Sequence, residues 1–265
     1  MKIVIAPDSF KESLTALEAA EAIETGFKKI FPQADIIKVP MADGGEGTVQ
    51  SLIDATGGKR LEIEVVAPLG NKTVGFFGLS GNGKTAIIEM AAASGLHLVA
   101  AAQRNPLLTT SYGTGELIKA ALDQGVSKII LGIGGSATND GGVGMLQALG
   151  AKFNDNQQQE LGYGGAELSR LQHIDLSGLD PRLQQLEIEV ACDVDNSLCG
   201  EHGASATFGP QKGATAAMVS QLDQALAHFA EISKYQLGIE IADIAGAGAA
   251  GGMEGGLWLL PTASV

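Results

Sequence analysis

The residues best suited to chemistry lie in a glycine-rich segment in the middle of the chain, Gly132 to Gly142. Between its glycines stand two hydroxyls, an amide and a carboxylate: Ser136, Thr138, Asn139 and Asp140. An apolar run from Lys128 to Gly132 precedes this segment, and a helical pattern begins at Val143. Glycine permits positive φ and lets a ligand approach the backbone amides, while the following helix presents its positive end. The pattern predicts an anion site, most naturally for phosphate.

Two further loops of this kind follow predicted strands. The loop Pro7 to Ser13 comes after the strand Lys2 to Ala6, and the loop Met41 to Thr48 comes after the strand Ile36 to Val39. Their side chains include charged and hydroxyl groups suited to phosphoryl chemistry: Asp8, Ser9, Lys11, Asp43 and Glu46. Open α/β sheets bind ligands at the carboxyl ends of their strands, so all three loops are candidate site segments.

The elements needed to position these loops follow an α/β pattern. Helical spacing covers 13–30, 49–55, 113–124, 143–149 and 214–235, and further strands are expected at 61–67, 74–79, 85–89 and 187–191. The first part reads as βαβ units, which implies parallel strands. After Gly57 the strands follow one another through short turns, which indicates an antiparallel meander. We therefore expect a domain boundary near Gly57.

One segment matches a phosphate-binding pattern letter for letter. Gly78 to Thr85 satisfies G-x-x-x-x-G-K-[ST], but a true P-loop runs from a strand into a helix. The residues after Thr85 are apolar and β-branched, and Asn82-Gly83 between two apolar runs is a strong hairpin signal. We predict a hairpin here, with Lys84 exposed in its turn.

Composition limits the class of protein. The chain has 265 residues, 45% of them hydrophobic, and a net charge of −13, which disfavours binding to nucleic acid or to an anionic membrane. It has no apolar run of the roughly 20 residues that span a bilayer and no signal peptide, so a cytoplasmic location is expected. Cys192 and Cys199 are expected to be buried thiols, and the four histidines follow no metal-binding pattern.

Seven segments together resemble the bacterial glycerate kinase family that includes the enzymes forming 2-phosphoglycerate. These segments are Ala6–Lys11, Ala42–Thr48, Glu89–Leu96, Thr109–Glu116, Gly132–Gly142, Ala191–Val194 and Phe208–Ala214. The resemblance runs in order from Met1 to about Met253, which makes chance similarity a poor explanation. Ser197 is a small departure, since the family usually has proline there.

The resemblance implies an ATP- and Mg²⁺-dependent kinase that converts glycerate to a phosphoglycerate, most naturally 2-phosphoglycerate. It also implies a two-domain α/β fold, with a flavodoxin-like parallel lobe and a second mixed-sheet α/β domain around an active-site cleft. Residues 1–57 would form the first part of the lobe, residues 58–245 the second domain, and residues 246–265 an aberrant C-terminal segment. Glycerate and ATP are the expected partners, and a homo-oligomer is an open option.

Site roles follow from the same resemblance and from the chemistry of phosphoryl transfer. The catalytic residues would be Lys11, Asp43 and Asp193, with Asp43 and Asp193 also binding metal. The expected substrate-binding residues are Asp8, Ser9, Gly44, Gly45, Glu46 and Thr114. The expected nucleotide-binding residues are Gly134, Gly135, Ser136, Thr138, Asn139, Asp140 and Lys212. Purely structural alternatives stay open, namely helix or loop capping for the polar side chains and surface exposure for the lysines.

The end of the chain departs from the family. Gly246 to Met253 resembles the family's entry to a helix, but the following glycine pair and Pro261 do not favour its continuation. We therefore interpret the sequence as a truncated or frame-shifted member of the family with an incomplete first lobe. For the isolated chain we expect little or no kinase activity, together with aggregation, oligomerisation or poor packing around Leu257 to Leu260. An alternative function follows: a catalytically inactive fragment that acts as a binding or assembly module. A phosphate-binding protein that is not a kinase is a third option.

Overall fold

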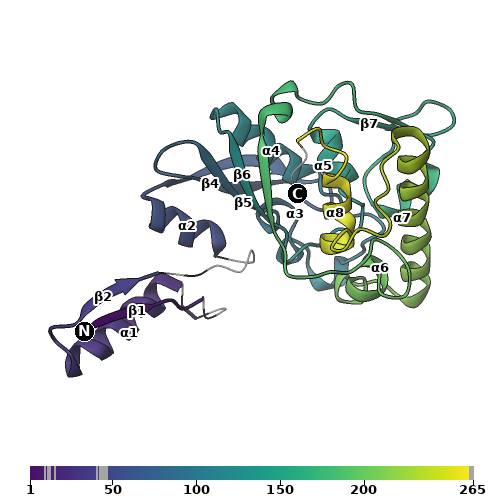
Figure 1. Cartoon of the computed structure of the whole chain (residues 1–265). Helices are drawn as coiled ribbons and strands as arrows, with labels where there is room; N and C mark the ends of the chain where they lie inside the picture. The colour runs from purple at the N-terminus through teal and green to yellow at the C-terminus, as the bar shows by residue number, and fades with distance from the viewer. Residues whose placement is uncertain (9, 11–12, 15, 40, 42–46, 263–265) are drawn as a thin grey trace.

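The computed structural model describes the chain except residues 9, 11–12, 15, 40, 42–46 and 263–265. Its centre is a five-stranded mixed sheet with strand order β3-β4-β5-β6-β9 (Figure 1). The strands are β3 (Lys59–Val66), β4 (Lys72–Leu79), β5 (Thr85–Glu89), β6 (Lys128–Gly132) and β9 (Glu187–Ala191). β3, β4 and β5 pair antiparallel, whereas β5, β6 and β9 run parallel. The mixed α/β class and the antiparallel meander are confirmed.

The segment that matches the phosphate-binding pattern is a hairpin turn. β4 and β5 pair with Leu79 opposite Ala86, and Gly83 takes a left-handed φ of +68° in the turn between them. Lys84 is exposed. Both predictions, the hairpin and the exposed lysine, are confirmed.

The two faces of the sheet are covered by different helices. On one face, Val49 and Ile53 of α2 (Thr48–Thr56) form a small core with Ile87 of β5. On the other, Ala86 and Ile88 of β5 belong to the main core. That core includes residues from helices α3 (Ala91–Ser94), α4 (Tyr112–Asp123) and α5 (Val143–Ala148). Successive strand residues thus point to opposite faces, as a pleated strand requires.

The first elements form a separate small unit. β1 (Lys2–Ile5) and β2 (Asp35–Lys38) pair in parallel and are joined by α1 (Ala16–Ile30). This unit projects from the rest of the molecule, with α2 between it and the main sheet (Figure 1). The domain division near Gly57 stays a prediction. α2 precedes this position but packs against β5 of the main sheet, so its contacts place it with the segment that follows Gly57.

The remaining elements of the described structure are short strands, further α-helices and 3₁₀ helices. They are β7 (Lys152–Asn154), β8 (His173–Asp175), α6 (Ala204–Phe208), α7 (Ala216–Leu237), α8 (Ala249–Leu257), and the short 3₁₀ helices η1 (Leu96–Leu98), η2 (Ala101–Gln103), η3 (Gly165–Arg170), η4 (Pro181–Gln185) and η5 (Pro210–Lys212). α7 begins where the Thr215 hydroxyl accepts a hydrogen bond from the Met218 N–H and ends at left-handed Gly238. Within the described part of the chain, no helix is both long and apolar enough to cross a membrane.

The C-terminal segment is well packed, so the expected poor packing is wrong. Leu257, Leu259 and Leu260 are 1%, 2% and 5% exposed and belong to the main core. Burial of each leucine contributes about 1.5 to 3 kcal/mol. The glycines that argued against a helix have a packing role: a Cβ at Gly256 would lie 2.4 Å from the Gly141 carbonyl oxygen. Close approach to the glycine-rich loop therefore requires glycine there.

Candidate active site

Strand register brings three chain segments to one edge of the sheet. Glu89 at the end of β5 pairs with Gly132 at the end of β6, and Gly132 pairs with Ala191 at the end of β9. Because these strands are parallel, the residues that follow each of them leave the sheet at the same level. Ile133 to Ser136 and Cys192 to Val194 therefore meet above the sheet, as ligand sites of open α/β sheets require.

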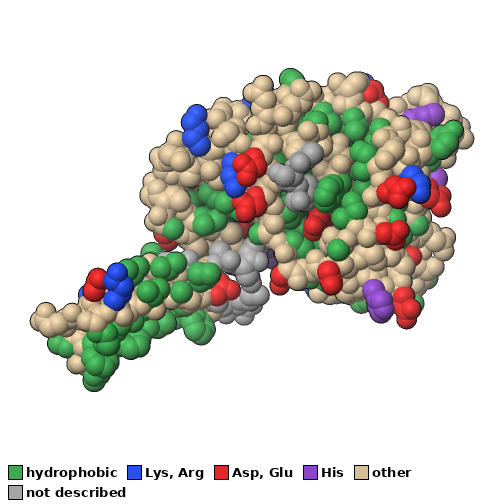
Figure 2. Space-filling view, in the orientation of Figure 1, with side chains coloured by type: hydrophobic (Ala, Val, Ile, Leu, Met, Phe, Trp, Pro, Cys, Tyr) green, Lys and Arg blue, Asp and Glu red, His purple; other side chains and the backbone are tan. Residues whose placement is uncertain are grey.

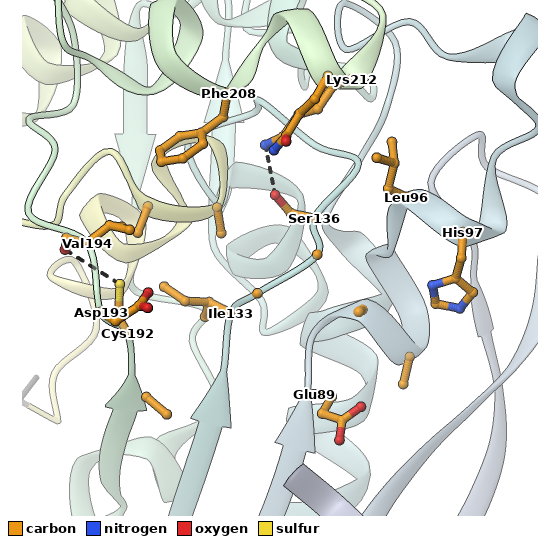
Figure 3. Close-up of a pocket in the computed structure, with 18 of the residues that line it drawn as sticks. Glu89, Leu96, His97, Ile133, Ser136, Cys192, Asp193, Val194, Phe208 and Lys212 are labelled. Carbon is orange, nitrogen blue, oxygen red and sulfur yellow. Dashed lines mark hydrogen bonds between the residues drawn. The ribbon is translucent and has the colours of Figure 1, made fainter. Parts of the chain in front are cut away.

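A cavity of about 530 Å³ lies at this edge (Figure 3). Part of its wall is polar and comes from the three strand ends and from η5: Glu89, Gly134, Gly135, Ser136, Asp193 and Lys212. Another part is apolar: Phe76, Ile133, Val194, Phe208, Ala249 and Ala250. Such a mixture, mostly apolar with a few convergent polar groups, is typical of small-molecule sites.

The glycine-rich loop offers free backbone donors to this cavity. Gly134 and Gly135 are exposed, and Gly135 has a left-handed φ of +73°. Within the described residues, the N–H groups of Gly134, Gly135 and Ser136 donate to no protein acceptor. The loop is held by its neighbours: the Leu96 N–H donates to the Gly135 carbonyl, and the Ala137 N–H donates to the Ser94 carbonyl. Successive free N–H groups of this kind can form a concave anion site.

Lys212 comes to the same loop from the other side. It is 2% exposed, and its Nζ donates a hydrogen bond to the Ser136 Oγ at 2.8 Å (Figure 3). The same Nζ also donates to the Thr138 carbonyl oxygen at 2.6 Å. Burial lowers the pKa of Lys212 to about 7, and the negative charge of Asp140 partly opposes this shift. The alternative of an exposed lysine is therefore wrong.

The last three polar residues of the loop lie behind the cavity wall. The Asp140 carboxylate accepts hydrogen bonds from the Ser111 N–H and hydroxyl and from the Gly142 and Gly144 N–H groups. It thus occupies the beginning of α5, where the sequence pattern suggested that an anionic ligand could bind. Burial raises the pKa of Asp140, and these donors oppose the rise. Thr138 and Asn139 are fully buried, and the Asn139 amide donates to the Ser205 hydroxyl. None of the three side chains lines the cavity.

Two carboxylates line the cavity. Asp193 is exposed and follows β9. Glu89, which sequence reasoning did not single out, is 5% exposed, and its Oε1 accepts a hydrogen bond from the Val49 N–H at the start of α2. The available signal was a lone charge ending the apolar run Ala86 to Ile88. The described residues contain no group of three or more metal-ligating side chains. One or two carboxylates suit Mg²⁺ when phosphate oxygens complete its shell, so this donor set fits that ion.

Two other cavity residues were not foreseen. His97 and Gln211 line the cavity, although neither belongs to a recognisable ligand pattern. Cys192 also lines it and is exposed, so the expectation of a buried thiol is wrong for this residue. Partial desolvation raises the pKa of Cys192 to about 11, which keeps it a neutral thiol near pH 7.

The remaining expected site residues are not brought to the cavity by the described structure. Thr114 is fully buried, and its hydroxyl shares a 2.8 Å hydrogen bond with the Ser94 hydroxyl. Asp8 is exposed, beyond β1 of the first unit. Six others lie outside the described residues: Ser9, Lys11, Asp43, Gly44, Gly45 and Glu46. A common site for Lys11, Asp43 and Asp193 stays a prediction.

Comparison with known proteins assigns the chain to a family. The family description "Glycerate kinase family" matches residues 3–265. The chain is 73% identical over 262 residues to a glycerate kinase of Haemophilus influenzae, covering 99% of this chain and 69% of the relative. It is 60% identical over 257 residues to the glycerate 2-kinase of Escherichia coli, covering 97% of this chain and 68% of the relative.

A solved structure agrees with the fold. The crystal structure of a protein assigned as glycerate kinase 2 from Salmonella typhimurium LT2 superimposes with a TM-score of 0.94 at 59% identity, covering 97% of this chain and 69% of that one. The chain thus spans about two thirds of the length of these relatives. Because the family description and the relatives extend along nearly all of the chain, the protein belongs to the glycerate kinase family and is a kinase.

Proposed function

We propose that this protein transfers the γ-phosphoryl group of ATP to glycerate and forms 2-phosphoglycerate. The main support for a phosphate site is the wall of the cavity. The three consecutive N–H groups from Gly134 to Ser136 have no protein acceptor among the described residues, and they lie beside the buried Nζ of Lys212. The family and the names of the relatives support the substrate, and the Escherichia coli relative supports the product. The cytoplasm is the proposed location.

The wall residues would act by positioning and by electrostatics. Phosphoryl transfer needs little covalent help from the protein, but charge spreads over the transferring oxygens in the transition state. Fixed N–H donors and a cation aimed at those oxygens stabilise that charge without reorganising. Gly134, Gly135 and Ser136 would hold nucleotide phosphate, and Lys212 would supply the cation. Asp140, Thr138 and Asn139 would contribute by fixing the loop rather than by touching phosphate.

The carboxylate side of the cavity would hold the metal. Asp193, with Asp43, would bind Mg²⁺, which neutralises charge on the phosphate oxygens when bound. Asp193 is suited to this because it is exposed in the cavity wall and no described residue pairs with it. Glu89 lies at the same strand level and would add a second negative group on this side.

Glycerate would bind toward the first unit of the chain. Asp8, Ser9, Gly44, Gly45, Glu46 and Thr114 are proposed for its contacts and Lys11 for its carboxylate or the transferring phosphoryl group. In this proposal β1, α1 and β2 belong to a flavodoxin-like lobe, and the site lies in the cleft between lobe and main sheet. The exposure of Val4 (59%) and Ile30 (73%) fits a unit that has further apolar surface to bury.

An assay with glycerate, ATP and Mg²⁺, coupled to ADP formation, tests the proposal on the 265-residue chain. Because the C-terminal segment packs into the main core, we expect turnover in place of the low activity anticipated from the sequence, with phosphorus NMR of the product showing phosphate on the 2-oxygen. Asp193→Asn should lower the rate by 10²-fold or more, since it removes a metal ligand. Asp195→Asn is the matched control, because Asp195 is exposed nearby but does not line the cavity. Nucleotide binding without turnover would instead favour the inactive binding module.

A further inference from the structure

We propose that Lys212 is mostly uncharged in the ligand-free protein at mildly alkaline pH and takes up a proton when phosphate binds at the cavity wall, so that nucleotide binding is coupled to proton uptake. This inference rests on the proposed phosphate site and adds a property of that site. It starts from the hydrogen bonds of the Lys212 amine rather than from its proximity to the loop.

The partners of the amine match its neutral form. Lys212 Nζ has two acceptors, the Ser136 Oγ and the Thr138 carbonyl oxygen. A neutral amine has two N–H bonds and an ammonium group has three, so a charged Lys212 would have one donor without a partner among the described residues. The described residues place no carboxylate in ion-pair contact with it. At 2% exposure, Lys212 has little contact with bulk water.

The surrounding charges do not cancel the cost of a buried ammonium group. Asp140 is the carboxylate that acts on Lys212, but four hydrogen bonds from other groups already engage it. Glu89, His97, Cys192 and Asp193 line the same cavity without a hydrogen bond to the amine. Arg104 approaches the next residue, Gly213, with its backbone and Cβ, and the sequence of α6 contains no titratable residue. Burial therefore dominates, consistent with the lowered pKa of Lys212.

A phosphate group would reverse this balance. Bound against the free N–H groups of Gly134 to Ser136, it would carry negative charge next to Ser136, and Lys212 Nζ lies 2.8 Å from the hydroxyl of that residue. The third N–H of an ammonium group would then have an acceptor, and the charge would have a counter-ion. The proton comes from solvent buffer, and no bond other than the new N–H forms.

The test is calorimetric titration of the 265-residue chain with MgADP. Above pH 7.5, uptake of one proton makes the dissociation constant rise about tenfold per pH unit up to pH 9. At pH 8.5, binding enthalpies in buffers of different ionisation enthalpy should show uptake of close to one proton. Lys212→Arg keeps the positive charge permanently. This variant should therefore bind MgADP with a dissociation constant that does not rise between pH 7.5 and 9, and without proton uptake. His97→Gln, which removes the other nearby base, should leave the uptake unchanged.

The outcomes separate this inference from the proposed function. Binding by the wild type with a flat pH profile overturns the inference and leaves the nucleotide site standing. The same holds if Lys212→Arg takes up as many protons as the wild type. Failure of MgADP to bind at any pH overturns the phosphate site and the inference with it. Asp140→Asn adds a graded check: losing the negative charge behind the loop should shift the onset of the pH dependence to lower pH.

Discussion

Two glycine-containing turns of this chain have similar residues and opposite surroundings. The turn Ser80 to Lys84 has the lettering of a phosphate-binding loop, yet its polar groups bond to one another: Asn82 Oδ1 accepts hydrogen bonds from the Ser80 hydroxyl and the Lys84 N–H. The loop Gly134 to Ser136 matches no such pattern, yet its N–H groups have no protein acceptor in the described structure and face a cavity with a buried lysine.

The difference comes from topology rather than from residue type. Ser80 to Lys84 joins two antiparallel strands in an exposed turn, so water can satisfy the polar groups that the turn does not pair itself. Gly134 to Ser136 follows the middle one of three parallel strands, where neighbouring chains from β5 and β9 enclose it. A phosphate site needs unused donors that the fold gathers beside a cavity, and of these two turns it is Gly134 to Ser136 that lines the described cavity next to a buried lysine. Figure 2 shows acidic side chains scattered over the viewed face, as expected for a chain of net charge −13. Local donors must therefore outweigh the overall charge.

The largest expected difference concerns an added methyl group, placed either at a glycine that packs against the glycine-rich loop or at a glycine in the hairpin turn. Gly251 packs on the glycine-rich loop with φ +73°, and a Cβ there would lie 2.0 Å from the Thr138 carbonyl oxygen. We expect Gly251→Ala to lower the free energy of unfolding by about 3 to 5 kcal/mol, from backbone strain plus overpacking. Gly83→Ala in the hairpin, at φ +68° with open space around it, should cost only about 1 to 2 kcal/mol. Urea unfolding of both variants measures this, and equal losses would contradict the packing role of Gly251.

The next largest expected difference is between Lys212 and Lys84, in the effect that their replacement has on the rate of turnover. Lys212→Met should lower turnover of MgATP and glycerate by about 10² to 10³-fold, because it removes the cation that would lie next to the developing phosphate charge in the nucleotide complex. Lys84→Met is the matched control and should leave the rate unchanged, since Lys84 is exposed in the hairpin. Steady-state kinetics of both variants measures this difference. A large loss in Lys84→Met would return the phosphate site to the hairpin.

The pH dependence of stability offers a third contrast. The folded pKa of Lys212, about 7, lies below its unfolded value of 10.5. Between these values the unfolded chain binds the extra proton, so this residue's contribution makes the protein more stable as pH rises, by about 1.4 kcal/mol per unit. Between pH 7.5 and 9, the unfolding free energy of the wild type should therefore gain about 2 kcal/mol relative to Lys212→Met. The free energy of unfolding of Lys84→Met should change with pH as it does in the wild type. If the wild type, Lys212→Met and Lys84→Met all show the same pH dependence, a buried neutral lysine is ruled out.

Local pattern was enough for much of the fold. Period-two and period-3.6 spacing located the strands of the main sheet and the helices α1, α2, α4, α5 and α7, and Asn82-Gly83 identified the hairpin. The misses were short elements whose existence depends on tertiary contacts. α8 is one of them: glycines that weaken an isolated helix are required where Gly256 meets Gly141.

The candidate site was less accessible to sequence reasoning. Gly134, Gly135, Ser136, Asp193 and Lys212 could be proposed because each follows or precedes a predicted element. Sequence order could not show that Asp140 turns away from the cavity, because its acceptor role depends on Ser111, 29 residues earlier. Nor could it show that Glu89 lies level with Gly132, which is set by strand register.

The smallest expected effect concerns the hairpin turn itself. Asn82→Ala removes the acceptor of two hydrogen bonds, from the Ser80 hydroxyl at 2.8 Å and the Lys84 N–H at 2.9 Å. Both donors can turn to water instead, so the free energy of unfolding should fall by only about 1 kcal/mol. Nucleotide affinity should not change, because the turn precedes the first residue of β5, whereas the cavity lies at the other end of that strand. Lys84→Ala, which removes an exposed side chain, should change stability by less than about 0.5 kcal/mol. Thermal unfolding together with MgADP titration checks both variants. A loss of affinity without a loss of stability in Asn82→Ala would show that the pattern match, rather than the strand ends, marks the phosphate site.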